Sequence, residues 1–166
     1  MAASHMIYAG MVREGIECIT NVRARHDGLR RNPWDDVECG SHYARALSSW
    51  SGILSLSGFR YHAGERHVEA VPRLPVANFR CFWSSGTGWG TFSYGAAGTP
   101  LTIRVLHGTL PCRSLTATAR ARIAPAGVRV NGQSAASSPD RQGRATRITL
   151  AEELVLRPGL DLVIEL

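Results

Sequence analysis

The change of pattern at Pro72 constrains the fold more than any other feature of this 166-residue sequence. Downstream of Pro72, short β-rich runs are separated by Gly, Pro, Asn or Ser, which is the pattern of an antiparallel sheet. Asn131-Gly132 predicts a hairpin turn, and residues 134–143 are expected to form an exposed loop. The runs cover residues 79–83, 90–94, 101–106, 115–119, 128–130, 146–150, 153–156 and 160–166.

Upstream of Pro72, the apolar residues follow a helical period instead. The first stripe predicts a helix that includes the first residues of the sequence and ends near Arg25. Gly28 can adopt the left-handed conformation that closes such a helix. A second stripe, with steps of four, three and four, predicts another helix that Gly58 ends. Two helices alone cannot cover that apolar face. The stripes are Ile7, Met11, Cys18, Ile19 and Val22, and then Tyr43, Leu47, Trp50 and Leu54.

The composition argues against several classes of function. The sequence contains 19 arginines and no lysine, and the arginines are spread along the chain. The net charge of +6 is therefore not concentrated in the basic patch that binding of nucleic acid requires. The four cysteines are 21, 42 and 31 residues apart, which does not match a zinc site and favours free thiols in a reducing, cytoplasmic compartment. No apolar run approaches the roughly 20 residues that span a bilayer, and no cofactor is expected.

A polar stripe within residues 30–50 is the strongest candidate for a functional site. Glu38, His42 and Arg45 are spaced by four and three residues, so they would share one face of the second helix, and Trp34 and Asp36 would come from the turn before it. Carboxylates and arginine hydrogen-bond sugar hydroxyls, and an indole offers an apolar face to a pyranose ring. The same spacing also fits a solvated helix face, and an acid/base pair of Asp36 and Glu38 is a weaker alternative.

Three stretches of the sequence, in this order, resemble the C-terminal part of the catalytic region of glycoside hydrolase family 116. They are RRNPWDDVECGSHYARALSSW (30–50), LSLSGFRY (54–61) and FRCFWSSGTGWGTFS (79–93). This is the family of bile-acid β-glucosidase, or non-lysosomal glucosylceramidase, and of related bacterial β-glucosidases. The resemblance extends from about Ile7 to Ser93, and the tail after Tyr94 fits only loosely.

The resemblance implies an α+β fold, in which a helical hairpin closing an α/α barrel precedes an antiparallel β segment. Residues 1–75 would then be the last helices of the barrel domain, and 76–166 the β-rich segment. It also implies a retaining mechanism whose two catalytic carboxylates lie upstream, so that no catalytic residue is expected here. The implied glucose contacts are Asp36, where the family carries glutamate, and Arg45, with Glu38, His42 and Trp34 in the same motif.

The glycine-rich stretch SGTGWGTFS (85–93) resembles a phosphate-binding loop only superficially, because it lacks the Gly-Lys-Ser/Thr ending and opens no helix. We expect it to be a tight turn with Trp89 in the core.

Two functions fit these observations. The first is a C-terminal fragment of a β-glucosidase that binds a β-glucoside or a glucosylated lipid together with the upstream part of the same enzyme, and that is inactive alone. The alternative is a free-standing carbohydrate-binding or protein-interaction module without catalysis.

Overall fold

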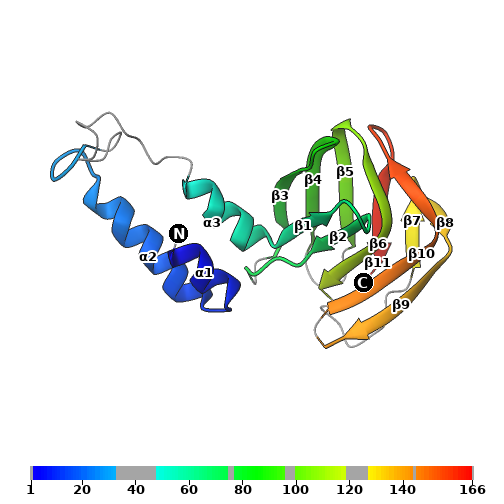
Figure 1. Ribbon diagram of the computed structural model, residues 1–166, viewed down its shortest axis with the longest axis horizontal. Coiled ribbons are helices and arrows are strands. Elements are labelled where there is room, and N and C mark those ends of the chain that lie inside the picture. The colour runs from blue at the N-terminus through cyan, green and yellow to red at the C-terminus, as the bar shows by residue number, and fades with distance from the viewer. Residues whose placement is uncertain are drawn as a thin grey trace. The chain divides into compact units, whose positions relative to one another are not determined.

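The computed structural model describes residues 2–32, 48–74, 77–95, 100–118, 127–143 and 145–165. The chain divides into two compact units, Met1–Ser57 and Gly58–Leu166. The first unit contains the described helices and the second contains the described strands (Figure 1). The contacts therefore place residues 59–70 with the strands that follow them rather than with the helices.

The helical unit consists of three short helices: α1 (Ala2–Tyr8), α2 (Val12–Arg25) and α3 (Ser48–Ser57). The chain does begin in a helix, but the expected single helix as far as Arg25 is wrong. Gly10 has a φ of 90°, a left-handed conformation that interrupts the helix between α1 and α2. The end of α2 at Arg25 is confirmed.

Small residues allow the three helices to approach closely. A Cβ at Gly15 of α2 would lie 2.5 Å from Cγ1 of the buried Ile7 of α1, so only glycine fits at this crossing. The hydroxyls of Ser4 in α1 and Ser51 in α3 are 2.7 Å apart and share a hydrogen bond. Many of the apolar side chains on α2 and α3 remain exposed, namely Ile16, Ile19, Val22, Trp50, Ile53 and Leu54.

The β unit contains two sheets, and each of them combines strands that are consecutive in sequence with strands that are distant in sequence. One sheet has the order β1-β2-β6-β10-β9, with β1 at Phe59–His62, β2 at His67–Ala70, β6 at Leu110–Thr118, β10 at Ala145–Leu156 and β9 at Ser137–Gln142. The other has the order β3-β4-β5-β11-β7-β8, with β3 at Phe79–Ser84, β4 at Gly88–Tyr94, β5 at Leu101–Gly108, β11 at Asp161–Glu165, β7 at Gly127–Val130 and β8 at Gln133–Ala135. Among the described pairs, only β2 and β6 run parallel.

A single apolar core joins the inner faces of both sheets, as in a β-sandwich. Alternate residues along each strand point inward, so that β11 buries Leu162 and Ile164 completely. Phe59 of β1 crosses between the layers and stacks on Trp83 of β3 at a centroid distance of 5.6 Å, with Phe92 of β4 at 5.4 Å. The two later stretches that carry the family resemblance therefore meet in this core.

The expected fold class is wrong, because the described chain is mostly β and its three short helices do not form a hairpin that closes an α/α barrel. The apolar stripes belong to short, partly exposed helices, whereas the extensive buried core belongs to the strands. The hairpin at Asn131-Gly132 is confirmed, since both residues have positive φ and join the paired strands β7 and β8. The loop expected at 134–143 is largely strand β9, which pairs with β10 at the sheet edge, where polar residues and Pro139 are tolerated.

Candidate functional site

The site expected from the sequence falls outside the described residues. The glucose-binding set was Trp34, Asp36, Glu38, His42 and Arg45, and all five belong to residues 33–47. Their roles stay predictions, and the candidate sites described here come from the β unit.

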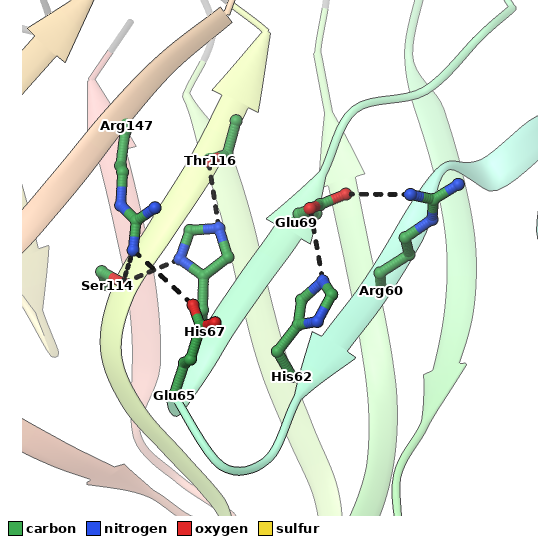
Figure 2. Close-up of polar contacts among 8 residues, drawn as sticks. All are labelled: Arg60, His62, Glu65, His67, Glu69, Ser114, Thr116 and Arg147. Atoms are coloured by element: carbon green, nitrogen blue, oxygen red, sulfur yellow. Dashed lines mark hydrogen bonds and ion pairs between the residues drawn. The ribbon is translucent and has the colours of Figure 1, made fainter.

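A group of interacting polar side chains lies on the outer face of the five-stranded sheet. In β2, Val68 and Ala70 point into the core, so His67 and Glu69 point outward. The parallel register places Ser114 of β6 beside His67, and Thr116 beside Glu69. Figure 2 shows these side chains with those of the neighbouring strands. We call the group formed by Glu65, His67, Ser114, Thr116 and Arg147 the His67 network.

His67 is the centre of this network and is only 4% exposed. Its Nδ1 lies 2.7 Å from the Ser114 hydroxyl and its Nε2 lies 3.1 Å from the Thr116 hydroxyl (Figure 2). Each hydroxyl can donate or accept, so a neutral imidazole satisfies both of its nitrogens. Burial lowers the pKa of His67, and the positive charge of Arg147 lowers it further.

Arg147 connects this network to the turn between β1 and β2. Its Nη2 lies 3.5 Å from the Ser114 hydroxyl and 3.9 Å from a carboxylate oxygen of Glu65. On the other side, Glu69 lies 3.3 Å from Nε2 of His62 and 3.8 Å from Nη1 of Arg60 (Figure 2). The outer face of β1, β2, β6 and β10 is therefore spanned by mutually compensating polar groups.

A serine hydroxyl next to a histidine nitrogen is also the arrangement of a nucleophile and its base, but two observations oppose that interpretation. Ser114 and His67 are both buried, so a substrate carbonyl could not reach the hydroxyl without local opening. The second nitrogen of His67 meets Thr116 instead of a carboxylate that would stabilise an imidazolium. The His67 network is best understood as a satisfied structural cluster that fixes the pairing of β2 with β6.

Several carboxylates of the β unit are paired with arginines across neighbouring strands or turns. The Arg104 guanidinium hydrogen-bonds both carboxylate oxygens of Asp161 and holds the pKa of that carboxyl below its usual value. Within the described ranges, no three His, Cys, Asp or Glu side chains gather closely enough to hold a metal ion. The further pairs are Glu153 with Arg66 and Glu165 with Arg129.

Trp89 differs from its expected position. It lies on the outer face of the six-stranded sheet and is 49% exposed, whereas Trp83 of the same motif is the tryptophan that enters the core, at 1% exposure. Its ring is nearly parallel to that of His107, with centroids 6.2 Å apart. The expectation that Trp89 is a core residue is therefore wrong.

Comparison with protein-family models and with curated proteins finds no match for this chain. The family resemblance therefore rests on the three stretches of sequence and remains a prediction. None of the helices that the structure describes combines the length and the apolar character needed to cross a bilayer.

Local sequence patterns do not indicate the His67 network, because strand pairing joins residues that are about fifty positions apart, such as His67 with Thr116. The unusual backbone setting of Trp89 did have a signal in the sequence, because a glycine precedes it and another follows it. Glycine in a strand interior often marks a place where another backbone approaches closely.

Proposed function

We propose that the chain is a non-catalytic, sugar-recognising part of a retaining β-glucosidase of the family 116 type. The resembling stretches support this proposal, and two of them pack against each other through Phe59, Trp83 and Phe92. The corresponding substrate is a β-glucoside or a glucosylated lipid, and the partner is the upstream part of the same enzyme. Trp34, Asp36, Glu38, His42 and Arg45 remain the proposed glucose contacts.

The observation that carries the non-catalytic part of the proposal is the arginine pairing of carboxylates in the β unit. A retaining glycosidase needs a carboxylic acid whose pKa is raised so that it can protonate the leaving group, with a second carboxylate about 5–5.5 Å away. Asp161 has the opposite setting, because Arg104 lowers its pKa. Glu153, Glu165 and Glu69 each form an ion pair with an arginine.

The β-sandwich also supports the alternative, a free-standing carbohydrate-binding or protein-interaction module. Its core is formed by residues of its own strands, from Phe59 in β1 to Ile164 in β11. A unit with its own core can fold and act independently. The two alternatives share a non-catalytic role and differ in whether the upstream enzyme is needed for sugar binding.

We propose a cytoplasmic location because the spacing of the cysteines does not match a disulfide framework. Cys18 and Cys112 are free thiols. Burial raises the pKa of Cys112 to about 12, so this thiol is protonated and unreactive at neutral pH.

Hydrolysis of an aryl β-glucoside by the purified chain tests the proposal. We expect no turnover, with an intact family 116 β-glucosidase as the positive control. Turnover that is lost in Asp36→Asn or Glu38→Gln would contradict the proposal, because it would reveal a catalytic pair in this chain.

The sugar-binding part is tested in an active enzyme that contains this segment joined to the upstream region of a family 116 enzyme. Arg45→Lys should lower kcat/KM by about ten- to a hundredfold, since a guanidinium fork fixes two neighbouring hydroxyls and an ammonium does not. The melting temperature should hardly change. Unchanged activity with a lower melting temperature would assign Arg45 a structural role instead.

A further inference from the structure

The outer face of the six-stranded sheet presents an exposed indole in a well-defined setting. Trp89 of β4 is directly opposite His107 of β5 on one side and Ser84 of β3 on the other. The His107 ring lies nearly parallel to the indole, at an interplanar angle of 15°. Ser84 is small, so the indole is supported from the β5 side and is little covered from the β3 side.

The backbone around Trp89 holds the side chain in this position. The register between β4 and β5 shifts between Trp89 and Gly90, as at a β-bulge, which is a common device for re-aiming a side chain. A Cβ at Gly90 would lie 1.9 Å from the carbonyl oxygen of Arg104, and one at Gly88 would lie 2.5 Å from that of His107. Both glycines are therefore required for the close approach of β4 to β5.

Hydrogen-bonding groups lie on the same face as the indole, together with the exposed Phe82 of β3. Thr91 lies two residues further along β4, which returns it to the face of Trp89, and Arg104 of β5 is directly opposite Thr91. Asp161 of β11 is opposite Arg104 and accepts hydrogen bonds from its Nε at 2.9 and 3.1 Å. We call the set of Ser84, Trp89, Thr91, His107 and the Arg104–Asp161 pair the Trp89 face.

The charge of the Trp89 face is compensated at Arg104 and Asp161. The pair retains donors and acceptors at its outer edge, because a guanidinium has five N–H groups and a carboxylate about four lone-pair sites. Arg80 points to the same side of the sheet, but it is opposite Ser93, about 13 Å along the strands from the Ser84–Trp89 pair. This arrangement favours a neutral polar ligand over a phosphate or a polyanion.

We propose that the Trp89 face binds a neutral saccharide, with a pyranose ring on the indole of Trp89 and its hydroxyls directed toward Ser84, Thr91 and the Arg104–Asp161 pair. An indole combines an apolar ring face with a polar edge, which matches the C–H face and the hydroxyl rim of a pyranose. This site is additional to the motif at residues 34–45 and does not depend on membership of a glucosidase.

Titration of the full chain with uncharged and anionic oligosaccharides tests the proposal. Calorimetry would use cellohexaose, maltohexaose and hexagalacturonate, which separate β-linked, α-linked and acidic chains. We expect one or both uncharged hexasaccharides to bind, and Trp89→Ala to weaken the binding by about tenfold or more, because truncation of an aromatic side chain that the ligand covers is among the costliest changes in a binding site. Trp89→Phe should restore part of the affinity.

Trp50→Ala is the matched control, because Trp50 of α3 is also 49% exposed but belongs to the helical unit. It should bind like the unmodified chain. Equal binding by Trp89→Ala, binding of hexagalacturonate alone, or no binding of any hexasaccharide at millimolar concentration would each overturn the proposal. Loss of binding in Arg45→Lys but not in Trp89→Ala would also overturn it while supporting the site at residues 34–45, so the two proposals fail separately.

Discussion

On each outer face of the β-sandwich, an outward-pointing aromatic or imidazole ring lies beside a residue of the adjacent strand, but one ring is buried and the other is exposed. On the five-stranded sheet, the outward residue His67 meets hydroxyls of the adjacent strand, and both of its ring nitrogens are engaged. On the six-stranded sheet, the outward residue Trp89 meets the small Ser84, and about half of the indole surface stays accessible. A dense polar cluster is thus closed to ligands when its members satisfy one another, and a sparser face can be the better binding surface.

The largest expected effect separates the two tryptophans of β3 and β4. Trp83→Ala should reduce the free energy of unfolding by about 3–5 kcal/mol, because Trp83 is buried in the core. Trp89→Ala should change it by about 0.5 kcal/mol or less, as expected for a surface residue. Urea unfolding of the two variants measures the difference. Similar losses in both would show that Trp89 is a structural residue and would break the contrast between the two faces.

Gly90→Ala should have the next largest effect. The added methyl group would collide with the carbonyl oxygen of Arg104, so we expect a loss of about 1–3 kcal/mol in unfolding free energy. Gly64→Ala is the control, since a Cβ at Gly64 meets nothing within 4 Å and should cost about 0.5 kcal/mol or less. If both variants were equally stable, β4 and β5 would not depend on glycine for their close approach.

Ser114→Ala probes the closed face. Removal of the hydroxyl leaves Nδ1 of the buried His67 without its partner, which should cost about 1–2 kcal/mol. Ser84→Ala, on the open face, should cost about 0.5 kcal/mol or less. A double-mutant cycle of Ser114→Ala with His67→Gln would give the coupling energy, and a value near zero would contradict the structural role of the His67 network.

The smallest effect is the pH dependence that His67 contributes. Its pKa is lower in the folded chain than the value of about 6.5 expected after unfolding, so the unfolded state binds more protons in the interval between the two values. The contribution to stability is therefore complete above about pH 6.5 and is lost as the pH falls toward the folded pKa. Thermal unfolding of the unmodified chain and of His67→Gln should diverge in that interval. Parallel curves would count against a lowered pKa.

The sequence predicted the strands better than their arrangement. Residues 101–106 lie within β5 and residues 146–150 within β10, because β-rich runs bounded by turn residues are a local signal. β1 and β2 were missed, since each has four residues and mixes charged and apolar side chains. The prediction of an α/α barrel was wrong, because it was inferred from a sequence resemblance, and the described residues form mostly strands instead.

There is also a physical reason why the sites could be predicted only in part. Trp83 and Trp89 share one motif, and only the register between β3, β4 and β5 decides which of them faces the core. The His67 network depends on the parallel pairing of β2 with β6, which no local pattern encodes. The set of Trp34, Asp36, Glu38, His42 and Arg45 is local in sequence, so it could be predicted, but it lies outside the described residues and stays a prediction.

The order of the strands has a consequence for synthesis on the ribosome. Of the described strands, β10 and β11 come last in sequence, yet each occupies an interior position, β10 between β6 and β9 and β11 between β5 and β7. Because the N-terminal part emerges first, at about 5–20 residues per second, β3 to β5 can pair with one another, and β7 with β8, before β11 emerges to join the two groups. The five-stranded sheet becomes continuous only when β10 has left the exit tunnel, and the six-stranded sheet only when β11 has left it. The nascent chain must therefore keep its unpaired strand edges from aggregating until translation of this segment is complete.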